Sequence, residues 1–156
     1  MAVYKIEQTQ FIPITLEEAW QFFSSPKNLD TITPPDMTFK ITSGNEDEPL
    51  HAGQIITYKV SPFAGIQMFW LTEITHVVDR KYFVDEQRFG PYTMWHHRHF
   101  FEAVEGGVKM RDVVYYKLPL GFLGDIAHAV FVKKKLQNIF GYRYTKLEQL
   151  FGKWNR

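Results

Sequence analysis

The pattern of hydrophobic and polar positions changes period along the chain and divides it into a strand-rich part and a helical part. Alternation with many β-branched and aromatic residues predicts strands over residues 3–14, 37–42, 54–60, 66–78, 82–89, 93–104 and 108–118. The links 61–65, 79–81, 90–92 and 105–107 are short, which is typical of antiparallel hairpins. The sequence therefore predicts an antiparallel meander.

Two short helical segments and one long helix accompany these strands. Thr15 and Glu18 have the spacing of a capping box, and a further helical turn is expected over 27–32. Beyond Pro119 the apolar period becomes helical and predicts one amphipathic helix over 123–153. Gly141 within it is expected to allow a bend or a close contact. The stripe of this helix comprises Val132, Leu136, Ile139, Arg143, Leu147 and Leu150.

The order of elements predicts a single α+β domain over residues 1–156. Its curved antiparallel sheet of six to seven strands should wrap around the C-terminal helix, because strands followed by a segregated helix form two layers. A long sheet of this kind twists strongly. A single helix is then expected to leave a space that it cannot fill alone.

The composition provides enough apolar residues for a core or a pocket, and it argues against several classes of function. The chain has 156 residues, 45% hydrophobic and 17% aromatic, with 14 phenylalanines, enough to fill a core or line an apolar pocket. A net charge of +1 argues against a nucleic-acid binder, and the absence of cysteine excludes thiolate chemistry and fits a cytoplasmic protein. No signal peptide, membrane span, phosphate loop, dinucleotide fingerprint or nucleophile elbow is recognisable.

The glycines at 106 and 107 suggest which side chains face the helix. If they form a two-residue turn, Phe101 lies opposite Asp112, His99 opposite Val114 and His97 opposite Tyr116. These residues then share the inner face with Trp95 and Met110, while the neighbouring positions carry Arg and Lys and face solvent. A tight turn at 79–80 would place Trp70 opposite Phe89, Thr72 opposite Gln87 and Ile74 opposite Asp85, with Asp85 and Gln87 inward.

Arg143 falls on the apolar stripe of the long helix and needs a partner there. A buried guanidinium requires an opposite charge, and the strand phases offer Asp112 or Asp85. Two interpretations remain open, a structural salt bridge or a polar cluster that binds a ligand.

The histidines at 96, 97 and 99 invite comparison with a metal site. Only His97 and His99 share a face, and a third ligand would have to be Asp85 or Asp112. No cysteine, HExxH motif or clustered carboxylates accompany them. Buried, hydrogen-bonded histidines are therefore expected, with no metal and no other cofactor.

An ordered set of short motifs over nearly the whole chain carries a family resemblance. The chain resembles the SRPBCC (START/Bet v 1-like) superfamily and, within it, the small bacterial branch known as ligand-binding SRPBCC domains or cell division inhibitors. That resemblance implies a helix-grip fold with a deep cavity for apolar molecules, and some members catalyse reactions there. The iron-binding insertion of the oxygenase branch is missing from this shorter chain. The motifs are WQFFSSPKNL (20–29), ITPP (32–35), WLTEI (70–74), FVDEQ (83–87), GPY (90–92), WHHRHF (95–100), MRD (110–112), PLG (119–121) and IFGYR (139–143).

The leading functional hypothesis is binding of a small apolar or amphipathic molecule, lipid-like or polycyclic aromatic. The cavity is expected to measure several hundred Å3 and to open near 61–65, 90–92 and the start of the last helix. An enzyme of cyclase, dehydratase or isomerase type, with His97 or His99 as general acid or base, is the alternative. A third possibility is a regulatory domain whose ligand changes a partner contact. The candidate ligand-binding residues are Trp70, Phe83, Asp85, Gln87, Trp95, His97, His99, Phe101, Asp112, Val114, Tyr116, Leu136, Ile139 and Arg143.

Overall fold

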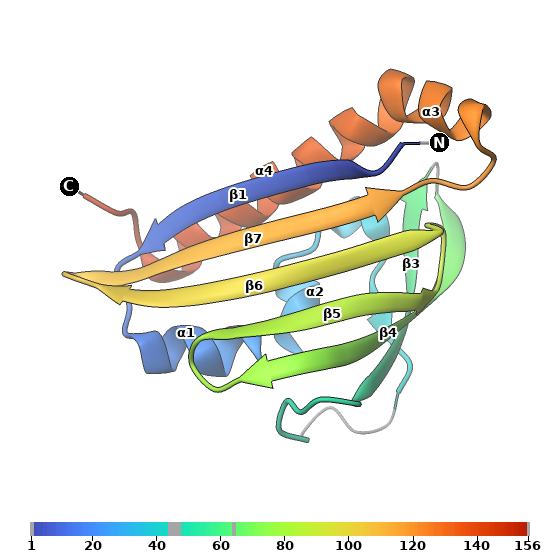
Figure 1. Ribbon diagram of the computed structural model, residues 1–156. Helices are drawn as coiled ribbons and strands as arrows, with labels where there is room; N and C mark the ends of the chain where they lie inside the picture. The colour runs from blue at the N-terminus through green and yellow to red at the C-terminus, as the bar shows by residue number, and fades with distance from the viewer. Residues whose placement is uncertain (1, 44–47, 64, 156) are drawn as a thin grey trace.

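The structure, a computed structural model, describes residues 2–43, 48–63 and 65–155 (Figure 1). The sequence also predicts an acidic loop over residues 44–53, and its residues 44–47 lie outside the described residues. Along the chain the elements are β1 (Tyr4–Ile12), α1 (Leu16–Phe23), α2 (Asn28–Thr31), a 3-10 turn η1 (Pro35–Met37), β2 (Lys40–Ile41), β3 (Ile55–Phe63), β4 (Ile66–Val78), β5 (Tyr82–Phe89), β6 (Met94–Val104), β7 (Gly107–Lys117), α3 (Phe122–Ala127), a π-helical segment η2 (His128–Val132) and α4 (Lys133–Phe151).

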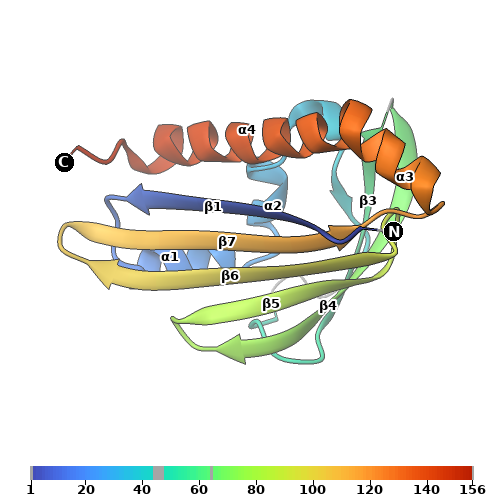
Figure 2. The same cartoon turned by 45° about the horizontal axis from the view of Figure 1, so that its top comes forward.

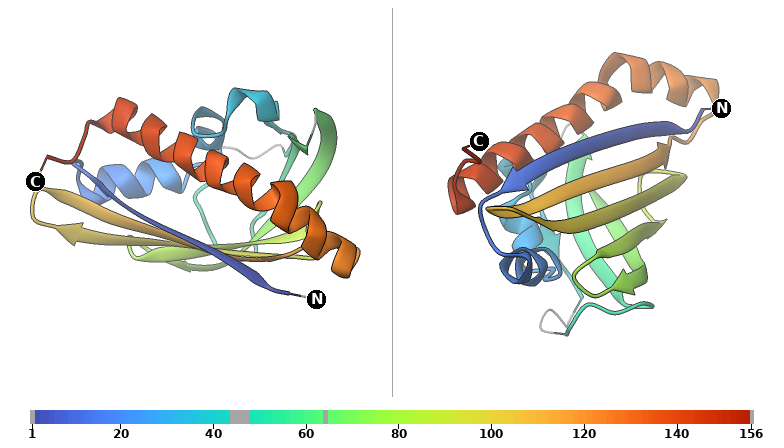
Figure 3. Two further views of the ribbon diagram at one scale, coloured as in Figure 1. Left: turned by 90° about the horizontal axis from the view of Figure 1, so that it is seen from above. Right: turned by 60° about the vertical axis from the view of Figure 1, so that its left-hand side comes forward.

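The strands form an antiparallel sheet, and the helices share one of its faces. Over the described residues the sheet has seven strands in the order β1-β7-β6-β5-β4-β3-β2. The long helix runs beside β1 and across the same face as α1 and α2 (Figures 2 and 3). The predicted α+β helix-grip architecture is confirmed.

Two apolar clusters hold the helices on the sheet. Under α4, the side chains of Leu136 and Phe140 pack with Trp70, Val114 and other inner-face residues. Under α1, Trp20 meets the rings of Phe83 and Phe101 edge-on, at centroid distances of 6.0 and 5.5 Å. The predicted capping box at Thr15 and Glu18 is present and begins α1 at the position where Trp20 can enter this cluster.

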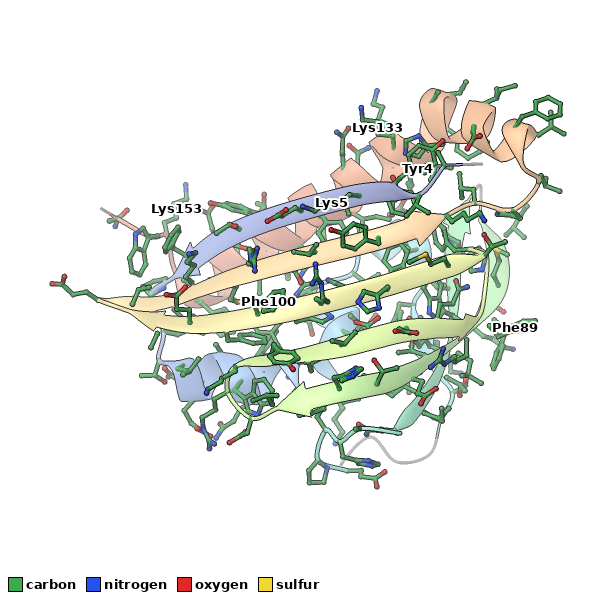
Figure 4. All side chains as sticks on the ribbon, viewed as in Figure 1. Tyr4, Lys5, Phe89, Phe100, Lys133 and Lys153 are labelled. Atoms are coloured by element: carbon green, nitrogen blue, oxygen red, sulfur yellow. The ribbon has the colours of Figure 1, made fainter. Side chains whose placement is uncertain are left out.

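The outer face carries the charged residues, as predicted from the strand phase. Figure 4 shows Lys5 and Phe100 on the side of the sheet that faces the viewer, away from the helices. The Arg111 guanidinium lies 4.6 Å from the centre of the Phe100 ring, so the aliphatic stem and the aromatic ring cover each other on that face.

The predicted register of the β6–β7 hairpin is wrong by two residues, but its faces are correct. Val104 pairs with Gly107, which makes Glu105 and Gly106 the turn and places His99 opposite Asp112. Gly106 adopts φ 86°, and Gly107 lies in the strand, where a Cβ would come within 2.2 Å of the Ile12 carbonyl oxygen. A two-residue shift preserves the faces because side chains alternate with period two. Accordingly, His97 lies opposite Val114 and Phe101 opposite Met110.

The β4–β5 hairpin also differs from a tight two-residue turn. Val78 pairs with Tyr82, so the turn has three residues, and Arg80 within it has φ 56°. An irregularity between Ile74 and His76 then restores the predicted pairs of Ile74 with Asp85 and Thr72 with Gln87. A second irregularity places Leu71, rather than Trp70, opposite Phe89.

The strand predicted over 37–42 is reduced to the two residues of β2. Met37 ends a 3-10 turn, and Thr38 has the left-handed angles φ 42° and ψ 53°, which do not fit a strand. Pairing with β3 therefore begins only at Lys40. The result is a short strand at this edge of the sheet.

The predicted long helix runs from Phe122 to Phe151 and changes hydrogen-bond pattern at the π-helical segment. Gly141 is exposed and a Cβ there would meet nothing within 4 Å, so the close contact expected as one alternative at this position is wrong. Leu150 is 43% exposed and does not belong to the buried stripe, whereas Phe140 does. Among the described residues, no helix is both long enough and apolar enough to cross a membrane.

Candidate functional site

A cavity of about 210 Å3 lies between the inner face of the sheet and the helices. Its walls come from β3 to β6, from α4, and from the segment that contains α1, α2 and β2. The volume is smaller than the several hundred Å3 expected from the sequence.

Most of the candidate residues on β4 to β6 and α4 line this cavity. The apolar ones give it a wall of rings and branched side chains, and the polar ones gather on one side. The candidates that line it are Trp70, Phe83, Asp85, Trp95, His97, His99, Leu136, Ile139 and Arg143.

The remaining candidates lie outside the lining, and each has another role. They are Gln87, Phe101, Asp112, Val114 and Tyr116. The Gln87 amide accepts a hydrogen bond from the Tyr92 backbone N–H at 3.2 Å and donates to its carbonyl at 2.5 Å, which closes the turn before β6. The Tyr116 hydroxyl lies 2.8 Å from His128 Nε2, and Phe101 belongs to the cluster under α1.

The opposite wall of the cavity was not found from the sequence. It contains Phe22, Leu29 and Ile32 from the α1–α2 segment, Phe39 just before β2, and Tyr58 from the neighbouring strand β3. Apolar residues alternate at 39 and 41 and at 56, 58 and 60, and this pattern could have identified the part of the wall that comes from strands. The α1–α2 segment has too few turns for a period to show which side chains face inward.

The partly exposed lining residues come from several walls of the cavity. They lie along the α1–α2 segment, around β2 and at Leu50, and also on β3, β5, β6 and α4, at Tyr58, Asp85, Trp95, Ile139 and Arg143. Pro62 and Tyr92 line the cavity as buried residues, and Gly90, Pro91 and the start of the last helix do not line it. The opening expected near 61–65, 90–92 and the start of the last helix stays a prediction.

A buried polar cluster forms one end of the cavity on three adjacent strands. Asp85 pairs with His97 across β5 and β6, and His99 pairs with Asp112 across β6 and β7, so four side chains stand together on the inner face. Arg143 reaches them from α4. The side chains of the four strand residues are between 8% and 17% exposed.

The two histidines each lie between the two carboxylates. Asp112 Oδ1 forms a hydrogen bond with His97 Nε2 at 2.8 Å. It also lies 3.0 Å from His99 Nδ1, but the direction of that contact does not allow a hydrogen bond. Asp85 Oδ2 is 2.5 Å from His99 Nε2 and 3.5 Å from His97 Nδ1. Phe83 stacks on the His99 ring with centroids 4.1 Å apart and holds its plane.

The prediction that a carboxylate lies within salt-bridge distance of Arg143 is confirmed. Its Nη2 atom is 3.5 Å from Asp112 Oδ2, and both side chains are only 11% exposed. The guanidinium also lies 5.4 Å from the centre of the Phe23 ring. Its Nε has no hydrogen-bond partner, although Arg143 lines the cavity.

The charged and titratable groups of the cluster shift one another's pKa values. Burial would raise the pKa of Asp112, but the Arg143 guanidinium and the two histidines outweigh it and hold that pKa well below its usual range. The pKa of Asp85 is lowered because His97 and His99 outweigh its burial. Burial and the neighbouring His99 lower the pKa of His97, whereas the two carboxylates overcome burial and raise the pKa of His99. Of the two rings, His99 therefore holds a proton more readily than His97.

The tyrosines around the cavity stay neutral. Burial raises the pKa of Tyr58 and, with the neighbouring Tyr116, that of Tyr92. The Trp70 indole N–H donates to Thr72 Oγ1 at 3.0 Å, so its polar atom is already satisfied inside the wall. Away from the polar cluster the lining therefore offers mainly apolar contact.

Comparison with known proteins gives matches among solved structures. No protein family model matches the chain, and no curated protein matches it. Protein CV1439 from Chromobacterium violaceum aligns with a TM-score of 0.73 at 11% identity, covering 95% of this chain and 97% of the other. Ginseng major latex-like protein 151 from Panax ginseng aligns at 0.68 and 12% identity, covering 96% and 97%. Ara h 8.0201 aligns at 0.61 and 17% identity, covering 95% and 99%.

These alignments span nearly the full length of both chains in each pair, and they include the sheet and the C-terminal helix that enclose the cavity. At such low identity they establish the fold. The resemblance drawn from the sequence motifs is confirmed at that level. The chain therefore has the helix-grip fold of the Bet v 1-like proteins.

Proposed function

We propose that this protein binds a small amphipathic molecule whose apolar body fills the cavity and whose acidic end meets Arg143. The observation that carries the proposal is the buried Arg143 side chain, which lines an otherwise largely apolar cavity with its Nε atom unpartnered. A buried polar atom of this kind gains a hydrogen bond when a ligand oxygen reaches it. Sites that combine an apolar wall with a few convergent polar groups are typical of small-molecule binding.

The cavity volume narrows the class of ligand. A cavity of about 150 Å3 accepts benzene, and this one measures about 210 Å3. Monocyclic aromatic acids and short acyl chains fit that volume without movement of the walls. A polycyclic ligand would require the α1–α2 wall to move outward.

Titration with a matched series tests the proposal. Phenylpropionate, phenylpropanol and phenylpropylamine share one apolar body, and Trp70 and Trp95 in the wall report binding by fluorescence. The acid should bind about tenfold more tightly than the alcohol, because a hydrogen bond to a charged group contributes about 1.5–3 kcal/mol. Native mass spectrometry of freshly purified protein should also show a co-purifying acid.

Two variants separate the apolar part of the site from its polar end. Ile139→Trp places a larger side chain in the cavity and should abolish binding of both acid and alcohol in calorimetry. Arg143→Met should remove only the preference for the acid. If no member of the series binds and nothing co-purifies, the proposal is wrong.

The arrangement supports binding rather than acid–base catalysis. His97 Nε2 is hydrogen-bonded to Asp112 and His99 Nε2 to Asp85, so each ring already has one nitrogen engaged by a buried carboxylate. Proton transfer to a ligand through these nitrogens would require the hydrogen bonds to be broken.

A further inference from the structure

We infer that Asp85, His97 and His99 form a site for a divalent transition-metal ion on the cavity wall. One donor atom from each lies within 4.8 Å of the other two, and all three side chains line the cavity. Two imidazoles and one carboxylate with the remaining positions open are a donor set for Zn2+ or Fe2+.

The two separations that involve Asp85 are close to those of a metal site, and the donor atoms of His97 and His99 lie within 4.8 Å of each other. Metal–donor bonds of about 2.0–2.2 Å at tetrahedral or octahedral angles separate the donors by about 2.9–3.5 Å. Asp85 Oδ2 lies 3.5 Å from His97 Nδ1, within this range, and 2.5 Å from His99 Nε2. The second pair needs to open by less than 1 Å, which a small rotation of the Asp85 carboxylate provides.

Asp112 holds the histidines in the orientation that a metal requires. Its Oδ1 atom faces His97 Nε2 at 2.8 Å and His99 Nδ1 at 3.0 Å, on the sides of the rings away from Asp85. Histidine ligands commonly donate their second ring N–H to a carboxylate, which fixes the ring and leaves the other nitrogen's lone pair for the metal. Asp112 makes this hydrogen bond to His97 and lies near the same side of His99 without one, and Arg143 at 3.5 Å balances its charge.

Asp112 would support the two histidines rather than bind the metal itself. Asp112 does not line the cavity, whereas the three proposed ligands do. The metal would therefore have protein on one side and the cavity on the other, where water or an oxygen of a bound molecule can complete its coordination.

The strands make this geometry rigid. Asp85 pairs directly with His97, and His99 with Asp112, in the centre of the sheet. Backbone hydrogen bonds on both sides of each strand fix the donors before any ion arrives. A site built on strands in this way loses little conformational entropy when the ion binds.

Metal titration without an organic ligand tests the inference, so its outcome is independent of the proposed function. Protein purified without a histidine tag is stripped with EDTA, dialysed, and titrated with Zn2+ by calorimetry and with Co2+ by visible absorption. One ion should bind per chain with micromolar or tighter affinity, and Co2+ should give the d–d bands of nitrogen and oxygen ligation. Asp85→Asn and His97→Gln should each weaken binding at least tenfold.

His96→Gln is the matched control, because His96 lies in the same strand on the outer face and pairs with Glu86. It should leave the affinity unchanged. Loss of binding in His96→Gln, or retention of full affinity in Asp85→Asn, would mean that a surface site takes the metal and would overturn the inference. No binding of either ion to the wild-type protein would do the same.

A measurement on the wild-type protein guards against variants that fail to fold. Imidazole nitrogen spectra recorded with and without Zn2+ should show metal on His97 Nδ1 and His99 Nε2, with protons on the nitrogens that face Asp112. Unchanged signals for both rings in the presence of saturating Zn2+ would refute the site.

Discussion

Replacing Arg143 by Met tests how the long helix is held over the polar end of the cavity. The substitution keeps a long, flexible apolar side chain and removes the charge that lies 3.5 Å from Asp112. Removing one partner of a buried ion pair costs about 3–5 kcal/mol, because the other charge stays buried without compensation. Both side chains are only 11% exposed, so solvent provides little relief.

Two features of the site reduce this cost. Asp112 keeps the hydrogen bond from His97 at 2.8 Å, and the unpartnered Nε of Arg143 disappears together with the guanidinium. An unsatisfied buried polar atom costs about 1–3 kcal/mol, which the substitution recovers in part. We therefore expect the free energy of unfolding to fall by about 2–3 kcal/mol, which lowers the melting temperature by about 4–12 °C for a chain of this size.

The assay is a set of thermal and urea melts in EDTA, so that bound metal does not contribute. Arg143→Met/Asp112→Asn removes both charges but keeps an acceptor for His97, and it should recover most of the lost stability. Lys134→Met on the exposed side of the same helix is the control and should change stability by less than about 0.5 kcal/mol. If Arg143→Met costs no more than Lys134→Met, the guanidinium is solvated, and the buried pair does not exist in solution.

Two further predictions concern the rest of the fold. Burial, and after it the charge of Lys133, lowers the pKa of His128, so the folded state favours the neutral ring. The contribution of this ring to folding stability is complete above the pKa of the unfolded chain, about 6.5, and is lost as the pH falls below that pKa. The stability difference between wild type and His128→Asn, measured in urea, should therefore shrink between pH 7.5 and 5.5, and a difference that grows would contradict the sign. Gly107→Ala should destabilise by about 1–3 kcal/mol, because its Cβ would lie 2.2 Å from the Ile12 carbonyl oxygen. Gly141→Ala, where a Cβ meets nothing within 4 Å, should stabilise the helix by about 0.5–1 kcal/mol, and equal effects of the two changes would refute the proposed contact.

The inner face of the sheet could be predicted because side-chain alternation survives an error in register. The β6–β7 turn was placed one residue late, which shifts the pairing by two residues, yet His97, His99 and Asp112 still point inward. The pairing of Arg143 with Asp112 followed from burial and charge alone. What the wrong register hid was that His99 lies directly opposite Asp112, which puts one carboxylate behind both rings.

The opposite wall and the helix details escaped prediction for a different physical reason. The α1–α2 segment is too short for hydrophobic periodicity, so its orientation is decided by tertiary packing on the sheet. In the long helix, the π-helical segment changes the number of residues per turn. The two residues that the predicted stripe placed wrongly, the buried Phe140 and the exposed Leu150, lie beyond this segment in the regular helix α4, so packing on the sheet decides their burial.

The short strand β2 has a consequence for how a molecule enters and leaves. It pairs with β3 only at Lys40 and Ile41, and α2 beside it is a single turn, so this wall has few backbone hydrogen bonds to break. Such segments open at a small fraction of the global unfolding free energy. Amide hydrogens of this wall should exchange orders of magnitude faster than those of β6 and β7. For a molecule bound as proposed, we therefore expect exchange through transient opening of the α1–α2 and β2 side, while the strands that carry the polar groups remain intact.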